Sequence, residues 1–168
     1  MQLSSFKGKK VLLSFYRHVG CPFTNLRFLD LRKQDEYFKK MGLIILSIYE
    51  SSTENLTRYC SKESFYSRII ANPEFDLYRL YDIELNDLKI LHSLYKGAYS
   101  KMIEGRKTFK DKFEPEGHRN LLGADFLIDE SGLIVYPYYN QFLGDHLPVR
   151  DIGRFIREEP MKVDIVSC

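Results

Sequence analysis

The chain has 168 residues, a length typical of one folded domain. It contains 44% hydrophobic and 29% charged residues, and its 12 Tyr and 12 Phe exclude the aromatic-poor composition of a disordered protein. The formal net charge of +2 is too small to indicate a nucleic-acid partner. No apolar run approaches the ~20 residues that cross a bilayer, and residues 1–10 lack the apolar segment of a secretory signal. We therefore expect a cytoplasmic protein with no membrane or nucleic-acid partner.

Two apolar runs predict strands that are buried on both faces. Residues Val11–Tyr16 follow a lysine-rich start, and residues 43–49 follow Gly42. Neither run alternates between apolar and polar residues, which is typical of a parallel sheet covered by helices on both sides. Residues 24–41 between them form one apolar helical face, from Phe28, Leu31, Phe38 and Met41. The pattern predicts a right-handed βαβ unit whose two strands are adjacent, parallel and central.

The middle of the chain predicts three helices and one short strand. In chain order these are a helix over 52–62, a strand over Arg68–Ala71, a short helix over 75–81 and a longer helix over 86–103. The polar residues 104–122 are long for a plain connection and predict a lid or a mobile loop. This region also contains a basic cluster, which consists of Lys101, Arg106, Lys107, Lys110 and Lys112. Such a cluster is usually a solvated surface, and the alternative is a surface that attracts an anionic substrate or an acidic partner.

The last third of the chain predicts a β-hairpin followed by a helix. Residues 124–129 and 133–139 form the two strands, and Gly132 suits a left-handed position in the turn between them. Pro137 favours an exposed edge of the sheet. Residues 149–158 then predict an amphipathic helix. The fold class is therefore α/β, with a mixed β-sheet flanked by helices on both faces.

The segment between the first predicted strand and the first predicted helix contains a candidate reactive cysteine. Cys21 lies at or just before the helix N-terminus, where unpaired N–H groups carry about half a positive charge and favour thiolate over thiol. Arg17 and His18 add to that field, and Pro22 suits the first helical turn. Thr24 is placed to donate a hydroxyl hydrogen bond to the sulfur. The alternative is an inert cysteine that packs as a small hydrophobe.

Residues 15–23, Phe-Tyr-Arg-His-Val-Gly-Cys-Pro-Phe, resemble the active-site segment of peroxiredoxin-like proteins of the AhpC/TSA group in the thioredoxin superfamily. The lead-in over residues 6–13 and the hairpin over residues 126–134 are similar to theirs as well. This resemblance implies a thioredoxin-like fold over a single domain, residues 1–168, with a helical or loop insertion at about 85–122. It also implies an antioxidant oxidoreductase with a redox-active cysteine.

The chain departs from the family pattern at three positions around Cys21. Many relatives carry a second Cys where this chain has Thr24, so a vicinal disulfide is impossible here. Peroxiredoxins have Pro and Thr at the positions of Ser14 and His18. The peroxide-binding geometry of that motif is therefore not transferred to this chain, and no later Arg is matched to theirs.

These observations predict a thiol-dependent oxidoreductase with Cys21, Thr24 and Arg17 as its catalytic residues. The Cys21 thiolate would attack a peroxide oxygen or a disulfide sulfur. An external thiol such as glutathione or thioredoxin would then resolve the intermediate, unless Cys60 or Cys168 does so. We expect Cys60 to be a bystander in a helix and Cys168 to belong to a disordered tail.

Two other interpretations remain beside the enzyme. Loss of the family's Pro, Thr and second Cys is also consistent with a non-catalytic interaction module of the same fold, and the resemblance leaves a homodimer open. His18 and Cys21 have His-x-x-Cys spacing, but no second close-spaced pair completes a zinc site. We therefore expect no metal and no cofactor.

Overall fold

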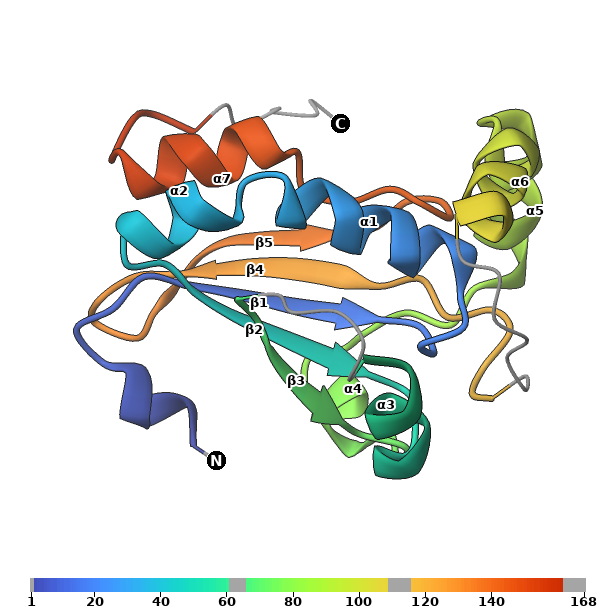
Figure 1. The fold of residues 1–168 in the computed structure, drawn as a ribbon, viewed down its shortest axis with the longest axis horizontal. Coiled ribbons are helices and arrows are strands. Elements are labelled where there is room, and N and C mark those ends of the chain that lie inside the picture. The colour runs from blue at the N-terminus through green and yellow to red at the C-terminus, as the bar shows by residue number, and fades with distance from the viewer. Residues whose placement is uncertain (1, 61–65, 109–115, 162–168) are drawn as a thin grey trace.

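The computed structural model describes residues 2–60, 66–108 and 116–161, and its centre is a five-stranded mixed sheet (Figure 1). The strand order is β3-β2-β1-β4-β5. The strands are β1 (Val11–Tyr16), β2 (Ile44–Tyr49), β3 (Arg68–Ala71), β4 (Ala124–Ile128) and β5 (Ile134–Tyr139). The first three are parallel, and β4 and β5 form the antiparallel hairpin. The expected α/β architecture is confirmed.

The predicted placement of the two apolar strands is also confirmed. β1 pairs in parallel with β2, from Val11 opposite Ile44 to Tyr16 opposite Tyr49, and pairs with β4 on its other side. All six residues of β1 are buried, as expected for a strand that is covered on both faces. Both strands therefore point their C-terminal ends toward the loop that carries Cys21.

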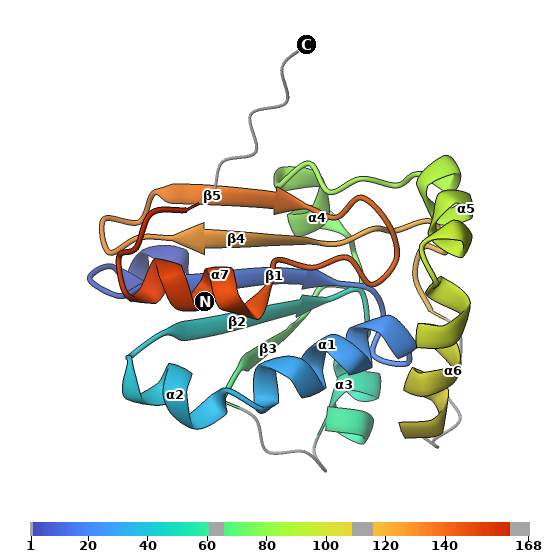
Figure 2. The ribbon, with the colours of Figure 1, turned by 90° about the horizontal axis from the view of Figure 1, so that it is seen from above.

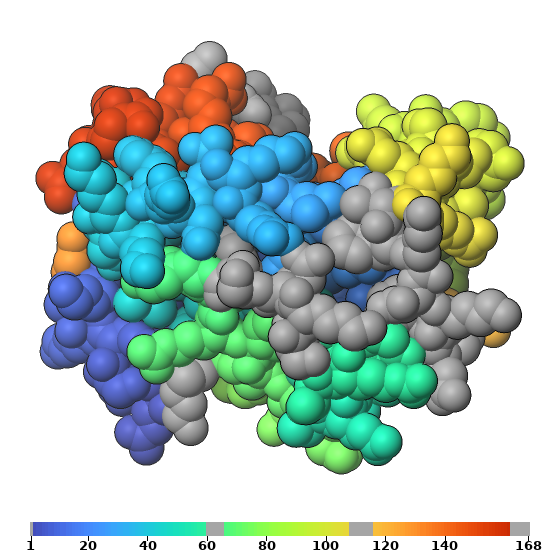
Figure 3. Space-filling model, in the orientation of Figure 1, coloured from blue at the N-terminus to red at the C-terminus, as the bar shows by residue number. Residues whose placement is uncertain are grey.

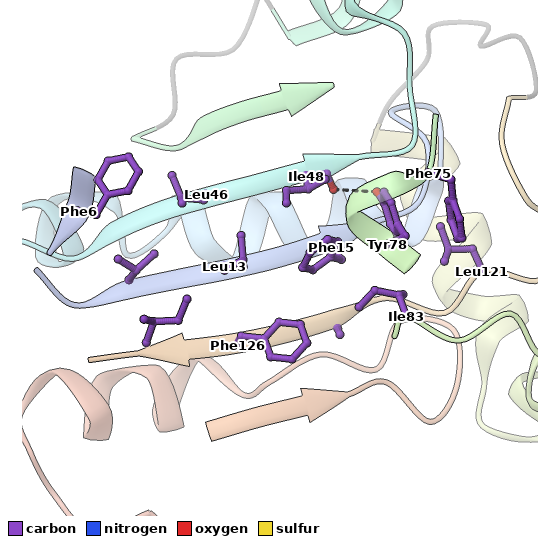
Figure 4. Close-up of a cluster of buried hydrophobic side chains, with 13 residues drawn as sticks. Phe6, Leu13, Phe15, Leu46, Ile48, Phe75, Tyr78, Ile83, Leu121 and Phe126 are labelled. Carbon is purple, nitrogen blue, oxygen red and sulfur yellow. Dashed lines mark hydrogen bonds between the residues drawn. The ribbon is translucent and has the colours of Figure 1, made fainter. Parts of the chain in front are cut away.

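Helices cover both faces of the sheet (Figure 2). On one face pack α1 (Pro22–Arg32), α2 (Asp35–Lys40), α3 (Thr53–Cys60) and α7 (Val149–Ile156). On the other face, α4 (Asp76–Leu80) and the 3-10 helix η1 (Leu3–Phe6) enclose an apolar cluster centred on Phe15 and Phe126 (Figure 4). In that cluster the Tyr78 hydroxyl donates to the Ile48 carbonyl at 3.1 Å. Among the described residues, no helix combines the length and apolarity needed to cross a bilayer.

Two predicted helices are each split in two. The helix expected over residues 24–41 breaks at Lys33 and Gln34, and α2 begins with acidic residues and ends with lysines, as the helix dipole favours. The helix expected over residues 86–103 is α5 (Asp87–Tyr95) and α6 (Ala98–Thr108). Gly97, with φ of +79°, takes the left-handed conformation that ends α5 and turns the chain into α6.

The predicted loop at residues 104–122 is wrong in its first part, because residues 104–108 complete α6. Residues 109–115, with Lys110 and Lys112 of the predicted basic cluster, lie outside the described residues. Leu85 pairs with Leu121 in an isolated antiparallel bridge, which closes the base of the segment that carries both helices. α5 and α6 project as a block at one end of the molecule (Figure 3).

Candidate active site

Cys21 is the N-cap residue of α1, directly beyond the C-terminal end of β1. Its N–H donates to the His18 carbonyl at 3.0 Å, which forms the tight turn between strand and helix. Its own carbonyl accepts the first helical hydrogen bond, from Asn25 N–H at 3.0 Å, and Pro22 occupies the first helical position. The Cys21 side chain makes no capping hydrogen bond to the helix backbone. The predicted position of the thiol at the start of the helix is therefore confirmed. The hydrogen-bond donor to the sulfur, however, is not the predicted Thr24 hydroxyl.

That donor is the guanidinium group of Arg17. Arg17 Nη1 lies 3.6 Å from the Cys21 Sγ, within range for a hydrogen bond to sulfur, and Nη2 donates to the Arg119 carbonyl at 2.8 Å. The guanidinium therefore places a positive charge and an N–H donor beside the sulfur. No hydrogen bond joins the Thr24 hydroxyl to the sulfur, although both side chains lie in the described part of the chain. Of the predicted site residues, the structure thus brings Arg17 and Cys21 together.

Helix α6 covers the sulfur. Cys21 is 1% exposed and packs in an apolar cluster with Phe23 and Ala98, against which Met102 and Leu143 also pack. Gly105 permits the close approach of α6, because a Cβ there would lie 2.6 Å from the Pro22 carbonyl oxygen. Ala98 and Met102 of α6 thus face the cysteine, while three apolar side chains of α5 are exposed, namely Leu88, Leu91 and Tyr95.

A buried ionic network lies between α1 and the sheet. Asp125 of β4 is fully buried and accepts from Ser14 Oγ at 2.5 Å and from Leu147 N–H at 2.9 Å. Arg27 Nη2 and His146 Nδ1 lie 3.6 and 3.7 Å from the same carboxylate. Ser14, at the position of the family's Pro, therefore anchors a charged group below α1 instead of contributing to the cysteine loop.

The network shifts three pKa values. Burial would raise the pKa of Asp125, but Arg27, His146 and Ser14 outweigh it and hold the pKa below its usual range. Burial lowers the pKa of His146, although Asp125 opposes that shift. Burial and the nearby Asp125 carboxylate raise the pKa of Tyr16 to about 12. At neutral pH these residues therefore form an ion pair of Arg27 and Asp125 beside a neutral imidazole.

As far as the structure describes them, the other candidate residues make no contact with the Cys21 sulfur that resembles the one from Arg17. Burial and the neighbouring Arg17 lower the pKa of His18, whose Nδ1 is buried without a hydrogen-bond partner. Thr24 is buried and borders a cavity of about 10 Å³, the size of one water molecule. Cys60 is the last residue of α3, and Cys168 lies outside the described residues. Within the described ranges, no group of three or more His, Cys, Asp or Glu side chains could hold a metal ion.

The roles of Asp125, Arg27, His146 and the loop that carries Arg119 were not predicted from the sequence. Asp125 carried a usable signal, since it interrupts the otherwise apolar run from Ala124 to Ile128. A lone carboxylate within a buried strand requires a partner. The identity of that partner could not be read from the sequence, because Arg27 and His146 are distant from it along the chain.

Residues 1–136 match the model of the AhpC/TSA family. The putative peroxiredoxin bcp of Haemophilus influenzae is 24% identical over 132 residues, which cover 76% of this chain and 84% of that protein. The peroxiredoxin Bcp of Escherichia coli is 23% identical over 138 residues, which cover 82% of this chain and 73% of that protein.

Solved structures show the same fold. The bacterioferritin comigratory protein of Xanthomonas campestris superimposes with a TM-score of 0.59 at 19% identity, covering 82% of this chain and 72% of that one. A putative thiol:disulfide interchange protein DsbE from Chlorobium tepidum gives a TM-score of 0.56 at 13% identity, covering 94% and 84%. The fold is therefore thioredoxin-like. With the family model matching most of its length, the chain belongs to the AhpC/TSA family.

Proposed function

We propose that this protein is a thiol-dependent peroxidase in which Cys21 is the single redox-active residue. The observation that carries the proposal is the contact between the Arg17 guanidinium and the Cys21 sulfur at the N-cap of α1. Membership of the AhpC/TSA family and the names of the curated relatives support the same chemistry. Arg17 stabilises the thiolate, which is the nucleophilic form of cysteine.

The reaction has a peroxidatic and a reductive half. The Cys21 thiolate attacks the terminal peroxide oxygen, the O–O bond breaks, and the leaving alkoxide or hydroxide takes up a proton as the cysteine becomes a sulfenic acid. An external thiol then condenses with the sulfenic acid and releases water. A second thiol displaces Cys21 from the mixed disulfide and restores the thiolate. Arg17 stays charged throughout and stabilises the anion at both ends of the cycle.

An external reductant follows from the surroundings of Cys21. Thr24 occupies the position that would complete a Cys-x-x-Cys pair, which excludes a disulfide at that position. The proposed electron donor is a small thiol such as glutathione or a protein thiol such as thioredoxin, and turnover in the Cys60→Ser and Cys168→Ser variants tests whether either of these cysteines resolves Cys21 instead. Since this cycle requires a pool of reduced thiols, we place the protein in the cytoplasm.

The apolar side chains packed around Cys21 support organic hydroperoxides as the substrate class. Cys21 is surrounded by the apolar side chains of Phe23, Ala98, Met102 and Leu143. Apolar surface of this kind would bind the alkyl part of a hydroperoxide. The Xanthomonas campestris structure is described in terms of alkyl peroxide reduction activity, which supports the same substrate class here.

The test is consumption of cumene hydroperoxide with dithiothreitol, glutathione or thioredoxin as the reductant. We expect Cys21→Ser to abolish turnover and Cys60→Ser to leave it intact. A second candidate function, a non-catalytic interaction module, is favoured by the burial of Cys21. Wild-type protein that consumes no hydroperoxide with any of the three reductants would support the module and refute the peroxidase.

A further inference from the structure

Glu50 is a buried carboxylate at the C-terminal end of β2, the edge of the sheet that carries Cys21. Its side chain is 4% exposed, and among the described residues Asp125 is the other buried carboxylate. Both of its oxygens contact His118: Oε2 accepts from the backbone N–H at 2.9 Å, and Oε1 pairs with the ring Nδ1. Glu50 therefore fixes both the backbone and the side chain of one residue in the loop that precedes β4.

The next residue in that loop contacts the active site. The Arg119 carbonyl accepts from Arg17 Nη2 at 2.8 Å, while Nη1 of the same guanidinium points to the Cys21 sulfur at 3.6 Å. A guanidinium is planar, so fixing one of its nitrogens sets the direction of the other. The chain of contacts thus runs from Glu50 through the backbone of residues 118 and 119 to Arg17 and Cys21.

The loop is shaped to let this contact form. Gly117 has φ of +71°, and a Cβ at this position would overlap the Glu50 carboxylate. Its neighbour Glu116 accepts a hydrogen bond from the Asn55 side chain of α3, and Ser51 Oγ accepts from Val19 N–H at 2.9 Å. The end of β2 therefore holds both the loop before β4 and the loop that leads to Cys21.

We propose that Glu50 is a positioning residue, which orients Arg17 toward the Cys21 sulfur by fixing the backbone of His118 and Arg119. The proposal rests on the proposed peroxidase function for its kinetic consequences only. Without the Glu50 carboxylate, the Arg119 carbonyl is no longer held in place, and Arg17 loses the contact that directs it to the sulfur. Glu50 itself touches neither substrate nor thiol.

The test compares Glu50→Ala, Glu50→Gln and the matched control Asp129→Ala, all in a Cys60→Ser, Cys168→Ser background. Asp129 also accepts backbone N–H groups, from Ser131 and Leu133, but at the opposite end of the sheet. The readouts are the pH dependence of Cys21 alkylation by iodoacetamide, kcat and KM with cumene hydroperoxide, and the thermal midpoint.

For Glu50→Ala we expect alkylation at neutral pH and kcat/KM to fall about ten- to a hundredfold, since small displacements at a reacting centre have effects of this size. The alkylation profile should move to higher pH, because less of the sulfur is held as thiolate. Glu50→Gln keeps an oxygen acceptor for the His118 N–H and should recover part of the loss. Asp129→Ala should change neither the profile nor kcat/KM.

The decisive comparison repeats Glu50→Ala in an Arg17→Ala protein. If Glu50 acts through Arg17, its substitution has no further effect on the alkylation profile there. An equal effect in both backgrounds, or a lowered thermal midpoint with an unchanged alkylation profile, would overturn the proposal. Alkylation needs no peroxide, so it tests Glu50 even if the wild-type protein proves to lack peroxidase activity.

Discussion

Arg17 and Cys21 lie four residues apart, and the guanidinium of the first is 3.6 Å from the sulfur of the second. The pair is formed within a single loop, between the end of β1 and the start of α1. The second anchor of Arg17, the Arg119 carbonyl, lies 102 residues further along the chain. The thiol and its cation are thus local in sequence, whereas the orientation of the cation depends on the tertiary fold.

Replacing Arg17 tests how much the cation contributes. A hydrogen bond to a charged group is worth about 1.5–3 kcal/mol, or about ten- to a hundredfold in rate. We expect Arg17→Ala to slow Cys21 alkylation at pH 7 by about this factor. Arg17→Lys should recover only part of it, since an ammonium cannot contact the sulfur and the Arg119 carbonyl with two fixed nitrogens. Alkylation at the wild-type rate in Arg17→Ala would show that the helix N-terminus alone activates the thiol.

Thr24 gives a prediction that differs from the one made on sequence. Because its hydroxyl makes no hydrogen bond to the sulfur, Thr24→Val should leave the pH profile of Cys21 alkylation close to that of wild type. Thr24→Cys should instead create a Cys-x-x-Cys pair, seen as the loss of two free thiols after mild oxidation. A Thr24→Val profile displaced by a full pH unit would mean that the hydroxyl does donate to the thiolate in solution.

The buried network predicts a stability that falls on the acid side of neutral. Burial lowers the pKa of His146 below 6.5, so the unfolded chain binds a proton first as the pH drops, and the free energy of unfolding decreases. His18 shifts in the same direction. The lowered pKa of Asp125 adds a second loss as the pH falls below about 3.8. Urea unfolding at pH 7.5, 6, 5, 4 and 3 measures both losses, and an unchanged midpoint between pH 7.5 and 5 would contradict the loss assigned to the histidines.

Asp125→Asn tests the ion pair at the centre of this network. Removing the carboxylate leaves the Arg27 charge buried without its counter-ion, and breaking a buried pair in this way costs about 3–5 kcal/mol. We expect a loss of this order in the free energy of unfolding at pH 7.5. Asp129→Asn is a suitable control, since that carboxylate accepts from the Ser131 and Leu133 N–H groups in the hairpin turn, outside the network. Similar losses of stability in the two variants would show that removing the partner of Arg27 is no more destabilising than removing a carboxylate elsewhere in the protein.

Gly105 tests the cover over Cys21. A side chain at this position must push α6 away from Pro22, so Gly105→Ala should expose the sulfur and raise its alkylation rate several-fold. Overpacking of this kind costs about 1–3 kcal/mol of stability. Arg106→Ala, on an exposed neighbour in the same helix, should change neither quantity. If Gly105→Ala lowers stability without any gain in alkylation rate, α6 is not what limits access to the thiol.

The sequence predicted the elements whose signal is local. Continuous apolar runs identified β1 and β2 as central strands, and the turn ending in Gly132 identified the hairpin. The helix breaks at Lys33 and Gly97 were missed, because the apolar spacing continues across them. Glu50 and Asp125 were missed for a different reason: each acquires its role from partners that only the fold brings near. At the cysteine itself, sequence reasoning placed the thiol and Arg17 correctly but assigned Thr24 a contact that Arg17 makes.

Because α6 packs over Cys21, the intrinsic reactivity of the sulfur and the fraction of molecules in which the sulfur is accessible are two separate quantities. If reagents reach it only when α6 moves aside, the observed rate is the intrinsic rate multiplied by the fraction of open molecules. An opening free energy of about 2.8 kcal/mol leaves about one molecule in a hundred open, since each 1.4 kcal/mol is a factor of ten. Substitutions on the outer surface of α6 would therefore tune the response to peroxide over orders of magnitude while every atom around the sulfur stays unchanged.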